Sequence, residues 1–225
     1  MKDNSGFTLI ELIIVIVILG ILAVTAAPHY IDLQKEAKVA VLQGYSAAIK
    51  SANNMMHGVW VISGSPSVHE APNDGNYDLF SFNGSKLKYC GSNTGGKMTE
   101  TGLCTEKDRK KMFLMQNGYL GISQNSKDSG GTFQTHAMLE GIGMDDDKVR
   151  QYTYSEYDAD TECAPRDSEE ICYYARRSGP GVTSRYAGYI VLPGYKPKTG
   201  KCYFEYIPPR DKMASPIYNV VSDGC

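Results

Sequence analysis

FTLIELIIVIVILGILAVTAA occupies residues 7–27 and decides how this chain of 225 residues is built. It contains one ionisable residue, Glu11, in 21 positions. As an α-helix the stretch would be about 31 Å long, which matches the hydrocarbon thickness of a lipid bilayer. The sequence therefore predicts a membrane-spanning helix over residues 7–28.

The six residues before this stretch, MKDNSG, are polar and end in the small residue Gly6. A secretory signal peptide has its small-residue cleavage site after the apolar segment, whereas here the small residue comes first. A cut after Gly6 would leave the hydrophobic helix on the mature chain and would free the amine of Phe7. We therefore expect residues 1–6 to be a leader peptide.

Glu11 needs a partner, because a carboxylate deep in lipid costs up to about 2.5–3.5 kcal/mol. The apolar stretch offers no basic residue, but a freed Phe7 amine would lie one helical turn away. The two groups could pair within one chain or between neighbouring chains. Gly20 and Pro28 are helix breakers and mark where this helix could bend or unwind.

Residues 6–12, GFTLIEL, with the apolar run to Ala27 and Pro28, resemble the class III leader and N-terminal helix of type IV pilins and pseudopilins. The continuation ILGILAVTAAPHYIDLQ is most similar to pilins of the mannose-sensitive haemagglutinin (MSHA) type. The resemblance covers roughly the first 50 residues, and Asp3 after Lys2 makes the leader less basic than the family pattern.

The resemblance implies a role for each matching position. Gly6 would precede the cut made by a prepilin peptidase, and Phe7 would become the N-methylated new N-terminus. Glu11 would neutralise the Phe7 amine of an adjacent subunit during filament assembly. The segment from Gly20 to Pro28 would lose its helicity in the filament.

The helical pattern continues beyond Pro28 in amphipathic form. One apolar stripe has spacings of three and four residues, after a charged beginning at residues 32–38. The stripe consists of Leu42, Tyr45, Ile49, Ala52 and Met56. We expect the helix to reach about His57, to end at Gly58 and to bury this stripe against one face of a sheet.

Residues 29–225 are long enough for one extracytoplasmic head. After the helix we expect a loop region with short hairpins over residues 58–110, and an Asn117-Gly118 hairpin within 110–122. Further strands are predicted at 130–139, 150–157, 171–177, 186–192, 201–207 and 217–221. The fold class is therefore α+β: one long N-terminal helix packed on an antiparallel β-sheet head, the architecture of type IV pilins.

Six cysteines follow the helix, and an even number in an exported domain favours disulfides. Short loops are easy to close, which favours local pairing, although bridges between loops stay possible. The favoured pairs are Cys90–Cys104, Cys163–Cys172 and Cys202–Cys225. Eleven of the 16 tyrosines come after residue 150 and are interpreted as cross-strand packing or, alternatively, as an adhesive surface.

The sequence contains no phosphate-binding glycine motif, nucleophile elbow or HExxH motif, and its four histidines lack ligand spacing. We therefore expect no enzyme and no cofactor. An acidic cluster is a candidate calcium site, although it equally fits a solvated turn. Its members are Asp145, Asp146, Asp147, Asp158, Asp160 and Glu162.

The expected function is that of a structural subunit of a type IV pilus, a surface filament for attachment and possible motility. The alternatives are a pseudopilin of a type II secretion system and a membrane-tethered binding protein that never polymerises. The resemblance implies self-association, a prepilin peptidase and methyltransferase, an inner-membrane assembly platform with its ATPase, and an outer-membrane secretin. The chain would lie in the inner membrane before assembly and in the surface pilus afterwards. A net charge of −2 predicts no specific nucleic-acid partner.

Overall fold

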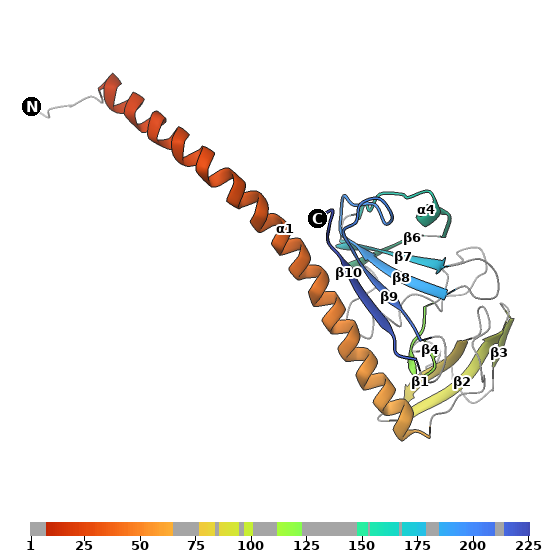
Figure 1. Cartoon of the computed structure of the whole chain (residues 1–225). Helices are drawn as coiled ribbons and strands as arrows, with labels where there is room; N and C mark the ends of the chain where they lie inside the picture. The colour runs from red at the N-terminus through yellow and green to blue at the C-terminus, as the bar shows by residue number, and fades with distance from the viewer. Residues whose placement is uncertain are drawn as a thin grey trace, which may run out of the picture.

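The computed structural model shows one long helix whose second half carries a β-rich head (Figure 1). It describes residues 8–64, 77–83, 86–94, 97–100, 112–122, 148–152, 154–166, 168–178, 185–209 and 214–225. The predicted strand at 130–139 lies outside these residues.

Helix α1 runs from Leu9 to Ile62, which confirms the long helix but makes the predicted end at Gly58 wrong. A glycine inside a helix costs only about 1 kcal/mol relative to alanine. Continuing for one more turn buries Trp60, which is only 8% exposed. That burial outweighs the weak helix preference of Gly58. The helix ends at Ile62 instead, shortly before Gly64, which has a φ of +87°.

The first sheet contains five antiparallel strands in the order β3-β2-β1-β4-β5. Three of these strands lie within residues 58–110, which were expected to be a loop region with short hairpins. The hairpins are present, but their strands belong to a sheet, so that the loop interpretation was wrong for these three strands. The strands are β1 (Tyr77–Asn83), β2 (Lys86–Thr94), β3 (Lys97–Glu100), β4 (Met112–Gln116) and β5 (Tyr119–Leu120).

The second sheet has the order β10-β9-β8-β7-β6 and includes the four strands predicted after residue 170. Its pair β6–β7 is parallel, which corrects the expectation of a purely antiparallel head. The strands are β6 (Val149–Tyr152), β7 (Ile171–Ser178), β8 (Arg185–Val191), β9 (Tyr203–Ile207) and β10 (Ile217–Val221).

The strand predicted at 150–157 stops at Tyr152 and is followed by a short helix, α4 (Tyr154–Asp158). The helical turn places the ring of Tyr157 4.9 Å from that of Tyr189 and 6.2 Å from that of Tyr174. Tyr157 is only 3% exposed in this position. Burial of the ring therefore outweighs the alternating pattern that predicted a strand.

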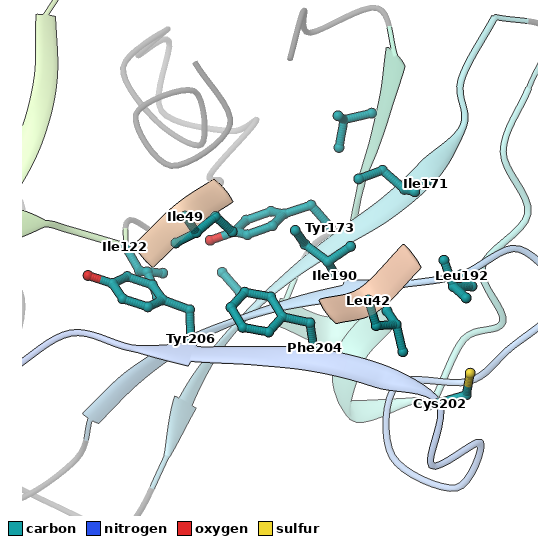
Figure 2. Close-up of a cluster of buried hydrophobic side chains, with 12 residues drawn as sticks. Leu42, Ile49, Ile122, Ile171, Tyr173, Ile190, Leu192, Cys202, Phe204 and Tyr206 are labelled. Atoms are coloured by element: carbon teal, nitrogen blue, oxygen red, sulfur yellow. The ribbon is translucent and has the colours of Figure 1, made fainter. Parts of the chain in front are cut away.

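The apolar stripe of α1 is buried as predicted, but on two sheets and not on one: Leu42, Tyr45 and Ile49 pack on the second sheet, and Ala52 and Met56 on the first. Leu42 and Ile49 are fully buried among side chains of β7, β8 and β9 (Figure 2). Their partners in this cluster include Tyr173, Ile190, Phe204 and Tyr206. Burying one such aliphatic side chain contributes about 1.5–3 kcal/mol, so that this contact holds the helix on the head.

The last turns of α1 support the first sheet as well. Met56 and Trp60 pack with buried residues of β1, β4 and β5. The Asn117-Gly118 turn between β4 and β5 confirms the predicted hairpin, since both residues have positive φ, 54° and 83°. A Cβ on Gly118 would lie 2.5 Å from Cε3 of Trp60, so that glycine is needed there for close approach as well as for φ.

A buried polar junction joins α1 to both sheets. The fully buried side chain of Asn53 accepts a hydrogen bond from the backbone N–H of Leu120 (2.8 Å) and donates one to the hydroxyl of Tyr218 (2.9 Å). The hydroxyl of Tyr206 donates to the carbonyl of Leu120 (2.7 Å). Side chains of α1 and β9 thus bind both backbone polar groups of Leu120 on β5.

Two of the three predicted disulfides are confirmed. Cys163 is bonded to Cys172 and Cys202 is bonded to Cys225. Cys90 is disulfide-bonded, and its predicted partner Cys104 lies outside the described residues. The Cys202–Cys225 bond holds the segment after β10 against the start of β9.

The carboxylate of Asp160 orders the loop of residues 193–201. It accepts hydrogen bonds from the backbone N–H of Lys198 (2.8 Å) and from the N–H (3.3 Å) and hydroxyl (2.5 Å) of Thr199. Partial burial raises the pKa of Asp160, but these hydrogen bonds and the nearby Lys196 outweigh burial and hold it below its ordinary value. The lowered pKa means that the ionised carboxylate stabilises the folded head.

Replacing Asp160 by asparagine is expected to lower the free energy of unfolding by about 1 kcal/mol at neutral pH. Because the folded pKa lies below the unfolded one, the stabilisation is present above about pH 4 and is lost as the pH falls through the folded value. Urea unfolding at several pH values should therefore show a difference between wild type and D160N that shrinks under acid. A difference that grows under acid would contradict this role of the carboxylate.

Candidate assembly interface

The beginning of α1 is fixed by a capping box between Thr8 and Glu11. The Thr8 hydroxyl accepts from the N–H of Glu11 (3.4 Å), and Oε2 of Glu11 accepts from the N–H (2.8 Å) and the hydroxyl (2.6 Å) of Thr8. The Glu11 carboxylate thus satisfies a free N-terminal N–H of its own helix. Gly6 and Phe7, the predicted processing residues, lie outside the described residues.

The first half of α1 exposes apolar side chains on all its faces. The large hydrophobic residues between Leu9 and Val24 are 45–75% exposed. Within the described part of the chain, α1 is the one helix whose length and composition would allow it to cross a membrane. So much exposed apolar surface requires lipid or another protein surface to cover it.

Gly20 and Pro28 lie inside the continuous helix. A Cβ added to Gly20 would meet nothing within 4 Å, so that no contact within the chain requires a glycine there. The hydroxyl of Thr25 donates to the carbonyl of Leu22 (2.9 Å), a type of bond that can bend a helix. The predicted loss of helicity concerns the assembled filament and stays a prediction.

The helix meets the head at Lys38. Its ammonium donates to the hydroxyl of Tyr195 (2.8 Å) and lies 5.3 Å from the centre of the Tyr195 ring. Asp32, Lys35 and Glu36 are exposed on the segment just before this contact. The exposed surface of α1 therefore changes from apolar to charged just before Lys38, where the helix contacts the head.

The structure describes three of the six candidate calcium residues, Asp158, Asp160 and Glu162, and these do not form a metal-binding group. Asp145, Asp146 and Asp147 lie outside the described part of the chain, and among the described residues no three His, Cys, Asp or Glu side chains form a group that could hold a metal. Asp160 binds the loop of residues 193–201 instead, and the backbone carbonyl of Asp158 accepts from the Lys198 ammonium.

The tyrosines that were interpreted as packing or as an adhesive surface are largely buried where the structure describes them. Tyr152, Tyr157, Tyr174 and Tyr189 form one cluster on the face of the second sheet next to α4, each at most 4% exposed. For these four residues the packing interpretation is confirmed.

Two important polar residues were not predicted. Thr8 has a signal in the sequence, because Ser or Thr followed three residues later by Glu is the pattern of a capping box. Asn53 has no such signal, since a single asparagine in an amphipathic helix equally fits a solvent-facing position.

Comparison with known proteins supports the reading of the N-terminus. Residues 1–27 match the family model of the prokaryotic N-terminal methylation motif. The type IV narrow pilus major component PilA5 of Thermus thermophilus is 53% identical over 48 residues, which cover 21% of this chain and 41% of that protein. The type IV major fimbrial protein FimA of Dichelobacter nodosus is 41% identical over 87 residues, which cover 36% of this chain and 53% of that protein.

A further relative is the type II secretion system core protein G of Pseudomonas aeruginosa, with 46% identity over 54 residues. That match covers 24% of this chain and 38% of the relative. The chain thus spans about half or less of the length of each of these relatives, and no solved structure matches it. The MSHA type stays a prediction. The methylation motif, the pilin relatives and the long apolar helix on a β-rich head show that this chain has the N-terminal signature and the α+β architecture of a type IV pilin.

Proposed function

We propose that the chain is a structural subunit of a type IV pilus and polymerises through the first half of α1. The observation that carries this proposal is the exposed apolar surface between Leu9 and Val24, which includes one carboxylate, Glu11, that caps the start of the helix. Before assembly lipid covers this surface, and in the filament other copies of the same helix cover it. The head, which packs on the second half of the helix, then forms the outside of the filament and makes the contacts of attachment.

The proposed processing chemistry is supported by the match of residues 1–27 to the N-terminal methylation motif. A prepilin peptidase and methyltransferase cuts after Gly6 and methylates the new amine of Phe7. Glu11 then pairs with the Phe7 amine of an adjacent copy, which compensates both charges as they leave water. The chain itself makes and breaks no bond, so that its role is structural and not enzymatic.

The proposed partners are other copies of the chain, the processing enzyme, an inner-membrane platform with its ATPase, and an outer-membrane secretin. The chain would reside in the inner membrane as a single-pass protein before it enters the surface filament.

A second candidate is a pseudopilin of a type II secretion system. It is favoured by the 46% identity over 54 residues to a core protein of such a system. A pseudopilin would use the same helix, but its filament would stay within the cell envelope.

The two functions are separated by locating the mature chain. Filaments sheared from the surface of cells that express it are expected to contain the protein, and mass spectrometry of its N-terminus is expected to show methylated Phe7. Retention in the envelope with the same processing would favour the pseudopilin. A native chain that still begins at Met1 would contradict both.

A further inference from the structure

A hollow of about 480 Å³ lies along α1 where the helix changes from apolar to amphipathic. Its described wall is one face of α1 with three charged side chains. The lining residues are Asp32, Lys35, Glu36, Val39, Ala40 and Gln43. Among the described residues, no hydrogen bond or ion pair occupies Asp32, Lys35 or Glu36.

The two carboxylates of this hollow lie on other sides of α1 than the contact that the helix makes with its own head. Glu36 precedes Lys38 by two residues and lies about 160° from it around the helix axis, and Asp32 precedes it by six and lies about 120° from it. Lys38 is bonded to Tyr195 in the loop of residues 193–201. Asp32 and Glu36 are therefore directed to other sides of the helix than the Lys38 contact, and both are exposed.

The same loop presents positive charge on the head. Lys196 and Lys201 are exposed, and the backbone between them is held by Asp160 through the N–H groups of Lys198 and Thr199. Because the loop is already ordered, docking it onto another surface costs less conformational entropy than docking a flexible segment.

We propose that the hollow beside Asp32 and Glu36 receives the lysine-bearing loop of residues 193–201 from a neighbouring copy of this chain. The inference rests on the proposed function. The hollow adjoins the half of α1 that is proposed to pack between subunits. Assembly of the filament would therefore bring a second copy of the chain next to the hollow. If the first halves of α1 from two copies pack in parallel, the charged segment of one helix lies beside the head of the other. Carboxylates that lose contact with water in this place need cationic partners.

A charge-exchange experiment on the full-length chain in filament-forming cells tests this pairing. Glu36→Lys and Lys201→Glu, each alone, place like charges together and should lower the amount of sheared filament at least about tenfold. The double variant E36K/K201E restores opposite charges and should recover filaments to within about threefold of wild type. Lys201 is chosen because Lys196 also acts on Asp160 in its own chain.

Lys50→Glu is the matched control, because Lys50 is exposed on the same helix but does not line the hollow. It should leave filament amounts within about twofold of wild type, which separates a specific pairing from a general effect of charge. The unfolding temperature of each variant in detergent should equal that of wild type. A lower amount of filament then reflects a defect in assembly and not in folding. Single reversals that assemble normally, or a stable double variant that is not rescued, would overturn the pairing.

Wild-type filaments give an independent test with a carbodiimide, which joins a carboxylate directly to an amine. Dimer bands from treated filaments should contain a cross-linked peptide pair with Asp32 or Glu36 on one side and Lys196 or Lys201 on the other. Dimers cross-linked only at other positions would overturn the proposal. If wild-type chains form no surface filament at all, the proposed function fails; if they form filaments that tolerate every reversal, only this pairing fails.

Discussion

A chain with Glu11 replaced by alanine is expected to insert into the membrane and to be cleaved, yet to give at least about a hundredfold fewer surface filaments. Removing one partner of a buried ion pair typically costs 3–5 kcal/mol, because the other charge stays buried without compensation. In the filament that other charge would be the Phe7 amine of an adjacent copy. Quantification of sheared filaments against membrane-bound chain measures the effect.

Glu11→Gln separates the two roles of this side chain. A glutamine can still accept a hydrogen bond from the Thr8 N–H and complete the capping box, but it cannot neutralise an amine. We therefore expect the glutamine variant to keep the start of the helix and still to lose most filaments. If Glu11→Gln assembles like wild type while Glu11→Ala does not, the cap and not the charge is what assembly needs.

The sequence predicts the helix of this protein well because its two halves carry unmistakable patterns. An uninterrupted apolar run predicts the first half, and apolar residues at spacings of three and four predict the buried face, where Leu42 and Ile49 are indeed fully buried. The end of the helix is harder to predict, since a glycine signals termination only when nothing beyond it packs. Trp60 packs on the first sheet beyond Gly58, and that contact is invisible in the local pattern.

The sheets are predicted strand by strand but not in their topology. Residues 171–177, 186–192, 201–207 and 217–221 are rich in Tyr, Val and Ile and lie between turn residues, which suffices to find a strand. The parallel pairing of β6 with β7 depends on where the connection through α4 runs. In that connection Tyr157 fits a helical turn and an alternating strand equally well until its partners Tyr174 and Tyr189 are known.

The proposed processing site and assembly residues are the part that the sequence specifies most directly. The roles proposed for Gly6, Phe7 and Glu11 depend on their order along the chain, so that a linear motif can reveal them. The hollow beside Asp32 and Glu36 depends instead on which way the helix is turned against the head. That rotation is set by long-range contacts such as the junction at Asn53, which forms hydrogen bonds with Leu120 and Tyr218.

Replacing Asn53 by leucine is expected to destabilise the head by about 3 kcal/mol. The leucine fits the apolar stripe, but it leaves the N–H of Leu120 and the hydroxyl of Tyr218 without the partners that Asn53 gives them. A buried polar group that loses its hydrogen bond costs about 1–3 kcal/mol. For a domain of this size the unfolding temperature should fall by roughly 6–12 °C.

The exposed neighbour Asn54 provides the matched control, since Asn54→Leu makes the same chemical change one position away on the same helix. It should shift the unfolding temperature by no more than about 2 °C. Thermal unfolding of the detergent-solubilised full chain, followed by near-UV circular dichroism, measures both variants through their tyrosines. Equal effects at positions 53 and 54 would mean that the buried junction contributes nothing specific to holding α1 and the two sheets together.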